Sequence, residues 1–199
     1  MSGMGLPGAE DYGFTRLWLL RHGETEWSRS GQYTGLTDLT LTPAGEDQAR
    51  AARATLDGVD FGLVLTSPLQ RARRTAELVG FPDAEVEPNA VEWDYGDYEG
   101  IKSADIRLKN PGYLIWTHGV PNGEAIAAVG ERADRIVERV RASGVANALV
   151  VAHGHFCRIL AARWLDLDPV EGRHFILGTA KACRLGWDKK TPAIEAWGL

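Results

Sequence analysis

This sequence of 199 residues has no long apolar run, no excess of basic residues and only two cysteines. No stretch of eighteen apolar residues occurs, so we expect no membrane-spanning helix. The opening MSGMGLPGAEDYG has no basic segment followed by an apolar one, which predicts a flexible leader over residues 1–13 and no secretory signal. The two cysteines, Cys157 and Cys183, lack CxxC spacing and lie in apolar surroundings. We therefore expect buried thiols in a cytoplasmic protein rather than a disulfide.

The charge balance argues against two further classes of partner. The chain carries 22 Lys and Arg against 27 Asp and Glu, which gives a formal net charge of −5. An acidic chain does not favour nucleic acid or an anionic membrane as its main partner, although it is compatible with a small cationic pocket. The contents of 44% hydrophobic and 25% charged residues are typical of a globular protein, and we expect one domain over residues 14–199.

Apolar runs alternate with helical patterns along this domain. The helix expected from residue 67 has Ser67 as its N-cap and Pro68 at its first position. The alternation predicts an α/β fold, a three-layer α/β/α sandwich around a mainly parallel sheet. The expected strands are 14–20, 61–67 and 146–154, with late strands at an edge over 181–188 and 193–199; the expected helices are 42–57, 67–80, 123–144 and 155–167.

Basic side chains follow the predicted strands. The first strand ends in Arg21 and His22, the second is followed by Arg71 one turn into the next helix, and the third ends in His153. Ligands of parallel α/β folds bind beyond the carboxyl ends of the strands, so we expect these side chains to converge. Arginine forks and helix N-termini together match the oxygens of a phosphate. The pattern predicts a phosphate pocket.

A histidine among arginines is expected to be neutral and therefore nucleophilic, because cationic neighbours disfavour the imidazolium. A phosphoryl group could then transfer to its ring nitrogen. The leaving oxygen needs a proton, and the segment VEWDYGDYEG, residues 91–100, offers four carboxylates as donors: Glu92, Asp94, Asp97 and Glu99. Glu92 lies between two apolar residues, as suits a partly buried acid, but spacing alone does not choose among the four.

These segments resemble the histidine phosphatase superfamily, which includes the cofactor-dependent phosphoglycerate mutases. Its first histidine motif is similar to LRHGETEW, its second arginine motif to TSPLQRARRTAEL, its proton-donor segment to EWDYGDYEG and its second histidine motif to VVAHGHFCR. The segment after the first motif is similar to GQYTGLTDLTLTPAGEDQA. The resemblance extends over nearly all of residues 14–199 and implies a phosphoglycerate mutase-like fold.

The resemblance also implies roles for individual residues. His22 matches the histidine that is phosphorylated, and Glu92 matches the general acid that later activates water. Arg21, Arg71 and His153 match the groups that hold the phosphoryl oxygens. Four further residues match positions that line the substrate pocket: Ser28, Thr34, Gly35 and Gly154. His155 is expected either to touch substrate or to cap the helix that follows.

Phosphatases and mutases are both members of this family. Its mutases carry a basic pair in a W-R-R-G context that grips a carboxylate, and the similar stretch here is Trp116-Thr117-His118-Gly119. The chain between Glu92 and His153 is also short, with little room for a capping insertion. We therefore expect a metal-independent phosphomonoesterase of the acid phosphatase type that acts on small phosphorylated metabolites. The alternatives are a cofactor-dependent phosphoglycerate mutase and a non-catalytic phosphate-binding module.

Substrate, metal and assembly complete the expectations. Two of the motifs also resemble sugar-bisphosphatases of the sedoheptulose bisphosphatase type, which adds sugar phosphates to the expected substrates. His153 and His155 form an HxH pair, as in metal hydrolases, but neighbouring arginines would repel a metal cation. We expect no metal and no cofactor. A homodimer formed through the late strands stays open.

Overall fold

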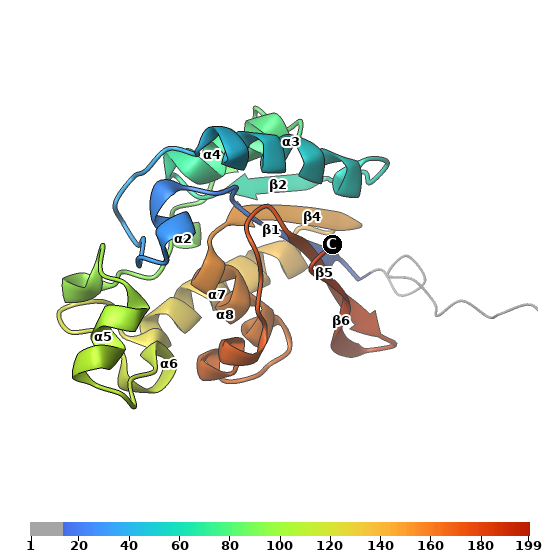
Figure 1. The fold of residues 1–199 in the computed structure, drawn as a ribbon. Helices are drawn as coiled ribbons and strands as arrows, with labels where there is room; N and C mark the ends of the chain where they lie inside the picture. The colour runs from blue at the N-terminus through green and yellow to red at the C-terminus, as the bar shows by residue number, and fades with distance from the viewer. Residues whose placement is uncertain (1–13) are drawn as a thin grey trace, which may run out of the picture.

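The computed structural model describes residues 14–199, so the predicted leader over 1–13 lies outside the described residues. Six strands form one sheet in the order β3-β2-β4-β1-β5-β6 (Figure 1). The strands are β1 (Arg16–Arg21), β2 (Leu63–Thr66), β3 (Glu85–Val86), β4 (Asn147–Ala152), β5 (Ala182–Asp188) and β6 (Thr191–Trp197). The first four run parallel, and β5 pairs antiparallel with β1 and with β6. A mainly parallel sheet with its late strands toward one edge is therefore confirmed.

Helices cover both faces of this sheet. They are α2 (Glu26–Ser30), α3 (Pro43–Leu56), α4 (Gln70–Leu78), α5 (Ser103–Lys109), α6 (Ile115–His118), α7 (Ile126–Ala142) and α8 (Gly154–Trp164), with 3-10 helices η1 (Pro88–Ala90), η2 (Gly96–Tyr98) and η3 (Pro169–His174). The four predicted helices correspond to α3, α4, α7 and α8. The sequence analysis missed β3 and the short helices, because elements this short show no clear hydrophobic period.

Alternating side chains of β1 supply two separate cores. Leu17 and Leu19 pack with α7 and α8 on one face, whereas Trp18 and Leu20 pack with α3 and α4 on the other. Figure 1 shows α3 and α4 above the sheet and α7 and α8 below it. Burial on both faces explains why the strand reads as one continuous apolar run. The three-layer α/β/α sandwich is confirmed.

The helix after β2 begins later than predicted. α4 starts at Gln70 with Leu69 at its N-cap, and the N–H of Gln70 donates to Oδ1 of the distant Asp38 (2.8 Å). The predicted cap, Ser67, instead uses its hydroxyl to accept from the N–H of Leu69 and to bond His153. The prediction that Ser67 and Pro68 open this helix was therefore wrong, since a contact with a residue far along the chain takes the hydroxyl.

Both cysteines are free and buried, as predicted, and burial raises the pKa of each thiol. No helix within residues 14–199 is long and apolar enough to span a membrane. β6 forms one edge of the sheet, so it is the strand to which a second copy would add. The homodimer stays a prediction.

Candidate active site

The carboxyl ends of β1, β4 and β2 bring the predicted site residues together. Arg21 pairs with Ala152 in the register of β1 and β4, and the N–H of His22 donates to the carbonyl of Ala152 (2.9 Å). His22 and His153 consequently follow adjacent strands, and their ring centroids lie 5.2 Å apart. Parallel pairing thus makes neighbours of two histidines that are 131 positions apart in the sequence.

His22 is held as a neutral ring with one nitrogen free. Its side chain is buried, and Nδ1 lies 2.7 Å from the carbonyl oxygen of Gly23. A carbonyl only accepts hydrogen bonds, so Nδ1 carries the proton and Nε2 keeps its lone pair. Burial, then the charges of Arg71 and Arg21, lower the pKa of His22 well below its usual range. The direction of this shift agrees with the neutral ring expected from the sequence, and the role of His22 as nucleophile stays a prediction.

The guanidinium of Arg21 has an N–H donor without a partner in the described part of the chain. Its Nη1 donates to the carbonyl of Leu177 (2.7 Å), whereas its buried Nε has no partner within residues 14–199. A Cβ at position 154 would lie 3.2 Å from Nε and Cζ of Arg21, so Gly154 lets the guanidinium lie close against the start of α8. A buried, unpaired N–H costs free energy and calls for an anionic or polar ligand.

Most N–H donors of Arg71 are bound within the protein. This arginine is fully buried and donates to the carbonyls of Gly35 (2.8 Å) and Thr37 (2.8 Å), and through Nε to Nδ1 of His153 (3.1 Å). His153 therefore carries its proton on Nε2, which donates to Ser67 Oγ (2.7 Å). Arg71 and His153 are thus both buried and hydrogen-bonded to each other, and the His153 ring packs against that of His22.

A carboxylate orders the loop that receives Arg71. Glu99 accepts from the backbone N–H of Gly35 (2.9 Å) and of Thr37 (3.1 Å), whose carbonyls point to Arg71. A Cβ at position 35 would come within 2.6 Å of the carbonyl oxygen of Trp93, so only glycine fits there without a shift. Gly35 thus shapes the loop, and Glu99 has a structural task.

Glu92 is the one carboxylate of the four that lines the cavity beside His22. Its Oε1 accepts from the N–H groups of Trp93 (2.9 Å) and Phe156 (2.8 Å), and its Oε2 accepts from that of His155 (3.0 Å). The carboxyl group therefore occupies the N-terminus of α8. Oε2 retains a lone-pair position, which makes it the oxygen able to carry a proton.

The cavity at the strand ends is lined by both charged and aromatic side chains. Its lining residues are Arg21, His22, Gln32, Tyr33, Thr34, Glu92, Tyr95, Gly154, His155, Arg158 and Leu177. Thr34, Gly154 and His155 thus lie where the sequence analysis expected them. Ser28 does not line the cavity; its side chain and that of Thr25 form the capping box of α2. Gly35 does not line the cavity either; its carbonyl accepts from Arg71.

His155 bonds a tyrosine rather than capping α8 with its side chain. Its Nδ1 lies 2.6 Å from the hydroxyl of Tyr95, and the ring of Trp116 packs 5.1 Å away. Burial and the charges of Arg158 and Arg21 lower the pKa of His155 to about 3. Burial also raises the pKa of Tyr95 well above its usual range, so both groups are neutral near neutral pH.

Arg158 is a cavity residue that the sequence analysis missed. Its guanidinium lies 4.5 Å from the ring centroid of Trp116, and it donates to the carbonyls of Gly172 (3.0 Å) and Arg173 (2.8 Å). The signal was present, because His155 and Arg158 are three positions apart on α8 and so share a helix face. Gln32 and Leu177 had no such signal, since they reach the cavity through loops.

Within residues 14–199, no group of three or more His, Cys, Asp or Glu side chains is arranged to hold a metal ion. The two histidines of the HxH pair bond different partners: His153 bonds Arg71 and Ser67, and His155 bonds Tyr95.

Comparison with known proteins adds an independent line of evidence on the family of this chain. The family model described as "Histidine phosphatase superfamily (branch 1)" matches residues 17–199. An acid phosphatase of Mycobacterium tuberculosis is 40% identical over 187 residues, which cover 92% of this chain and 92% of that protein. Sedoheptulose 1,7-bisphosphatase of Saccharomyces cerevisiae is 38% identical over 182 residues, covering 75% of this chain and 67% of the yeast protein. A solved structure of a Mycobacterium tuberculosis open reading frame superposes with a TM-score of 0.89 at 40% identity, covering 93% of this chain and 97% of that one.

Proposed function

Since the chain belongs to the histidine phosphatase superfamily, as its motifs predicted, we propose that it is a metal-independent phosphomonoesterase that hydrolyses small phosphorylated metabolites through a phosphohistidine. One observation carries the proposal. The free Nε2 of neutral His22, the unpaired Nε of Arg21 and the carboxyl group of Glu92 belong to residues of the same cavity. A nucleophile, an anion donor and a proton carrier are the groups that phosphoryl transfer to histidine needs.

In the first step, Nε2 of His22 attacks phosphorus. The Nε2–P bond forms, the bond from phosphorus to the leaving oxygen breaks, and that oxygen takes the proton from Oε2 of Glu92. Arg21 binds the equatorial oxygens, where charge is concentrated in the transition state. His153 packs against the ring of His22, and Arg71 in turn bonds His153; the direct contact of Arg71 and His153 with phosphoryl oxygens stays a prediction.

In the second step, the Glu92 carboxylate takes a proton from water while the water oxygen attacks phosphorus. The Nε2–P bond breaks, inorganic phosphate leaves, and His22 returns to its neutral form. The hydrogen bond from Nδ1 to the Gly23 carbonyl supports both steps, because it keeps the same tautomer throughout.

The part of the cavity around His155, Tyr33 and Tyr95 suits a leaving group with hydroxyl groups. Nε2 of His155 has no partner within residues 14–199, so a substrate hydroxyl can bond it, and Tyr33 and Tyr95 offer apolar faces beside it. We assign sugar phosphates as the substrate class. The mutase alternative is less supported, because Thr117 and His118 are exposed and do not line the cavity where a basic pair would grip a carboxylate.

Phosphorus NMR tests hydrolysis against transfer. The enzyme is incubated with 3-phosphoglycerate, a trace of 2,3-bisphosphoglycerate and a sugar phosphate, with EDTA throughout. We expect inorganic phosphate to grow and the sugar phosphate resonance to shrink. Growth of 2-phosphoglycerate without inorganic phosphate would identify a mutase, and no turnover without added metal would refute the metal-independent mechanism.

Two substitutions test the assigned residues. His22→Ala should abolish turnover and the acid-labile phosphoenzyme seen when a quenched wild-type reaction is analysed. Glu92→Gln should reduce hydrolysis of alkyl phosphates far more than that of aryl phosphates, because a good leaving group needs little protonation. Full activity of His22→Ala would remove the phosphohistidine from the mechanism.

A further inference from the structure

Arg132, on the middle of α7, binds the main chain that carries Glu92. We propose that Arg132, together with its ion-pair partner Glu124, is a positioning residue for the proton donor. The inference rests on the proposed role of Glu92 as the general acid. It assigns to α7, a helix outside the cavity, the task of holding the carboxyl group at the reacting oxygen.

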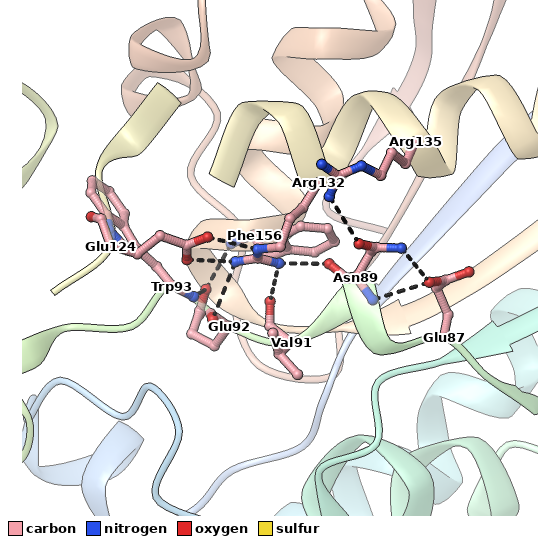
Figure 2. Close-up of polar contacts among 9 residues, drawn as sticks. All are labelled: Glu87, Asn89, Val91, Glu92, Trp93, Glu124, Arg132, Arg135 and Phe156. Carbon is pink, nitrogen blue, oxygen red and sulfur yellow. Dashed lines mark hydrogen bonds and ion pairs between the residues drawn. The ribbon is translucent and has the colours of Figure 1, made fainter. Parts of the chain in front are cut away.

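The guanidinium of Arg132 binds three carbonyl groups of the segment 89–92, which ends at Glu92 (Figure 2). Nη1 donates to the carbonyls of Asn89 (2.6 Å) and Val91 (3.1 Å), and Nη2 lies 3.5 Å from that of Glu92 itself. Nε and Nη2 each donate to the carboxylate of Glu124 at 2.8 Å. All three nitrogens are thus in use, and most of their bonds converge on residues 89–92.

The same guanidinium also touches the other support of Glu92. It lies 5.1 Å from the ring centroid of Phe156, the residue whose backbone N–H donates to Oε1 of Glu92. Arg132 therefore contacts the loop that carries Glu92 and the first turn of α8 that receives its carboxylate.

Glu124 adds a second connection on the far side. Its carbonyl accepts from Nε1 of Trp93 (2.7 Å), and its N–H donates to the carbonyl of Asp94 (3.0 Å). Its side chain is 20% exposed and that of Arg132 is 13% exposed, so the pair is largely shielded from water. Hydrogen bonds from Arg132 to the residues before Glu92, and between Glu124 and the two residues after it, therefore hold the main chain of Glu92 on both sides.

A lysine at position 132 would keep the charge but not these bonds. An ammonium is a compact donor without the planar fork, so it cannot serve Glu124 and the carbonyls of residues 89–92 together. A shift of about 1 Å in a catalytic group costs up to about 100-fold in rate. The loss should fall on reactions that need the proton, which separates a positioning role from general damage to the fold.

The next arginine along α7 supplies a matched control. Arg135 is exposed and makes a single long contact, 3.4 Å, with the side chain of Asn89 (Figure 2). Arg135→Lys is therefore the same substitution one turn further along α7. Arg135 faces the same loop as Arg132 but makes no bond to the main chain of Glu92.

The experiment compares kcat/KM for an alkyl phosphate, glycerol 2-phosphate, and an aryl phosphate, p-nitrophenyl phosphate. For Arg132→Lys we expect the alkyl rate to fall about tenfold or more and the aryl rate by less than about threefold. Arg135→Lys should change neither. In a Glu92→Gln background, Arg132→Lys should produce no additional selective loss, because its effect passes through the carboxyl group.

The outcomes separate the inference from the proposed function. Equal losses on both substrates in Arg132→Lys, with a selective loss in Glu92→Gln, would overturn the positioning role alone. Equal losses in Glu92→Gln would overturn the acid role, and the inference with it. If Arg132→Lys does not fold, Glu124→Gln is measured in the same way; an unchanged ratio of alkyl to aryl rates would then overturn the inference.

Discussion

Lowering the pH from about 7.5 to about 5.5 should remove about 4 kcal/mol of folding stability from this protein. The cause is the set of three histidine rings around the cavity. Burial is the leading cause that lowers the pKa of His22, His153 and His155 in the folded chain, in the last case to about 3. In the unfolded chain each ring has its ordinary pKa of about 6.5.

The sign follows from proton binding. Below about pH 6.5 the unfolded chain binds protons that the folded chain does not, so stability is complete above that pH and is lost as the pH falls. Each ring contributes about 1.4 kcal/mol over these two pH units, and three rings contribute about 4 kcal/mol. Whole domains are stable by roughly 5–15 kcal/mol, so the loss is large. Carboxylates contribute mostly at lower pH, since their ordinary pKa values lie near 4.

Urea unfolding at the two pH values measures the effect, in buffers without phosphate, because an anion bound to the folded cavity would add stability. The variant His155→Asn should reduce the pH-dependent loss by about 1.4 kcal/mol, to about 2.7 kcal/mol. The exposed His118 provides the control, and His118→Asn should leave the loss unchanged. A wild-type loss below about 1.5 kcal/mol would refute the reasoning, because it would mean that the buried rings take up protons without unfolding.

Two further substitutions follow from the loops behind the site. Glu99→Gln removes the charge from an acceptor of the N–H groups of Gly35 and Thr37, so it should destabilise the protein by about 1–2 kcal/mol and lower turnover on alkyl and aryl phosphates alike; a selective loss on alkyl phosphates would contradict this assignment. Gly23→Ala should cost about 1–3 kcal/mol in thermal unfolding, because its methyl group would overlap the backbone of Gly45, whereas Gly112→Ala, where a Cβ meets no atom within 4 Å, should be nearly neutral; equal stabilities would show that the backbone at Gly45 yields freely.

Several features of the fold could be predicted because they depend on neighbours in sequence. The apolar run before Arg21 and His22 predicts a strand buried on both faces and places the two polar residues at its carboxyl end. Such strand ends meet at one rim in a parallel sheet, so the convergence of His22 and His153 needed no coordinates. The neutral state of His22 was also predictable, since an arginine precedes it in the chain.

Other features depend on contacts between distant segments, which local spacing does not encode. The placement of the Glu92 carboxylate at the cavity follows from the N–H groups of His155 and Phe156, more than sixty residues away. Ser67 could not be assigned to His153 from a capping pattern, because the pattern contains no information on what packs across the sheet.

By itself, the sequence predicted most of the strands and helices, the family, and His22 as the nucleophile, because each prediction depends on short motifs or on hydrophobic period. Only the tertiary structure decided how the donors are distributed: Arg21 keeps an unpaired Nε, while Arg71 has most of its donors bound to the loop and to His153. It also decided that Arg132 binds the main chain that leads to Glu92. Hydrogen bonds go to whichever acceptors packing brings within about 3 Å, and packing is a property of the whole chain.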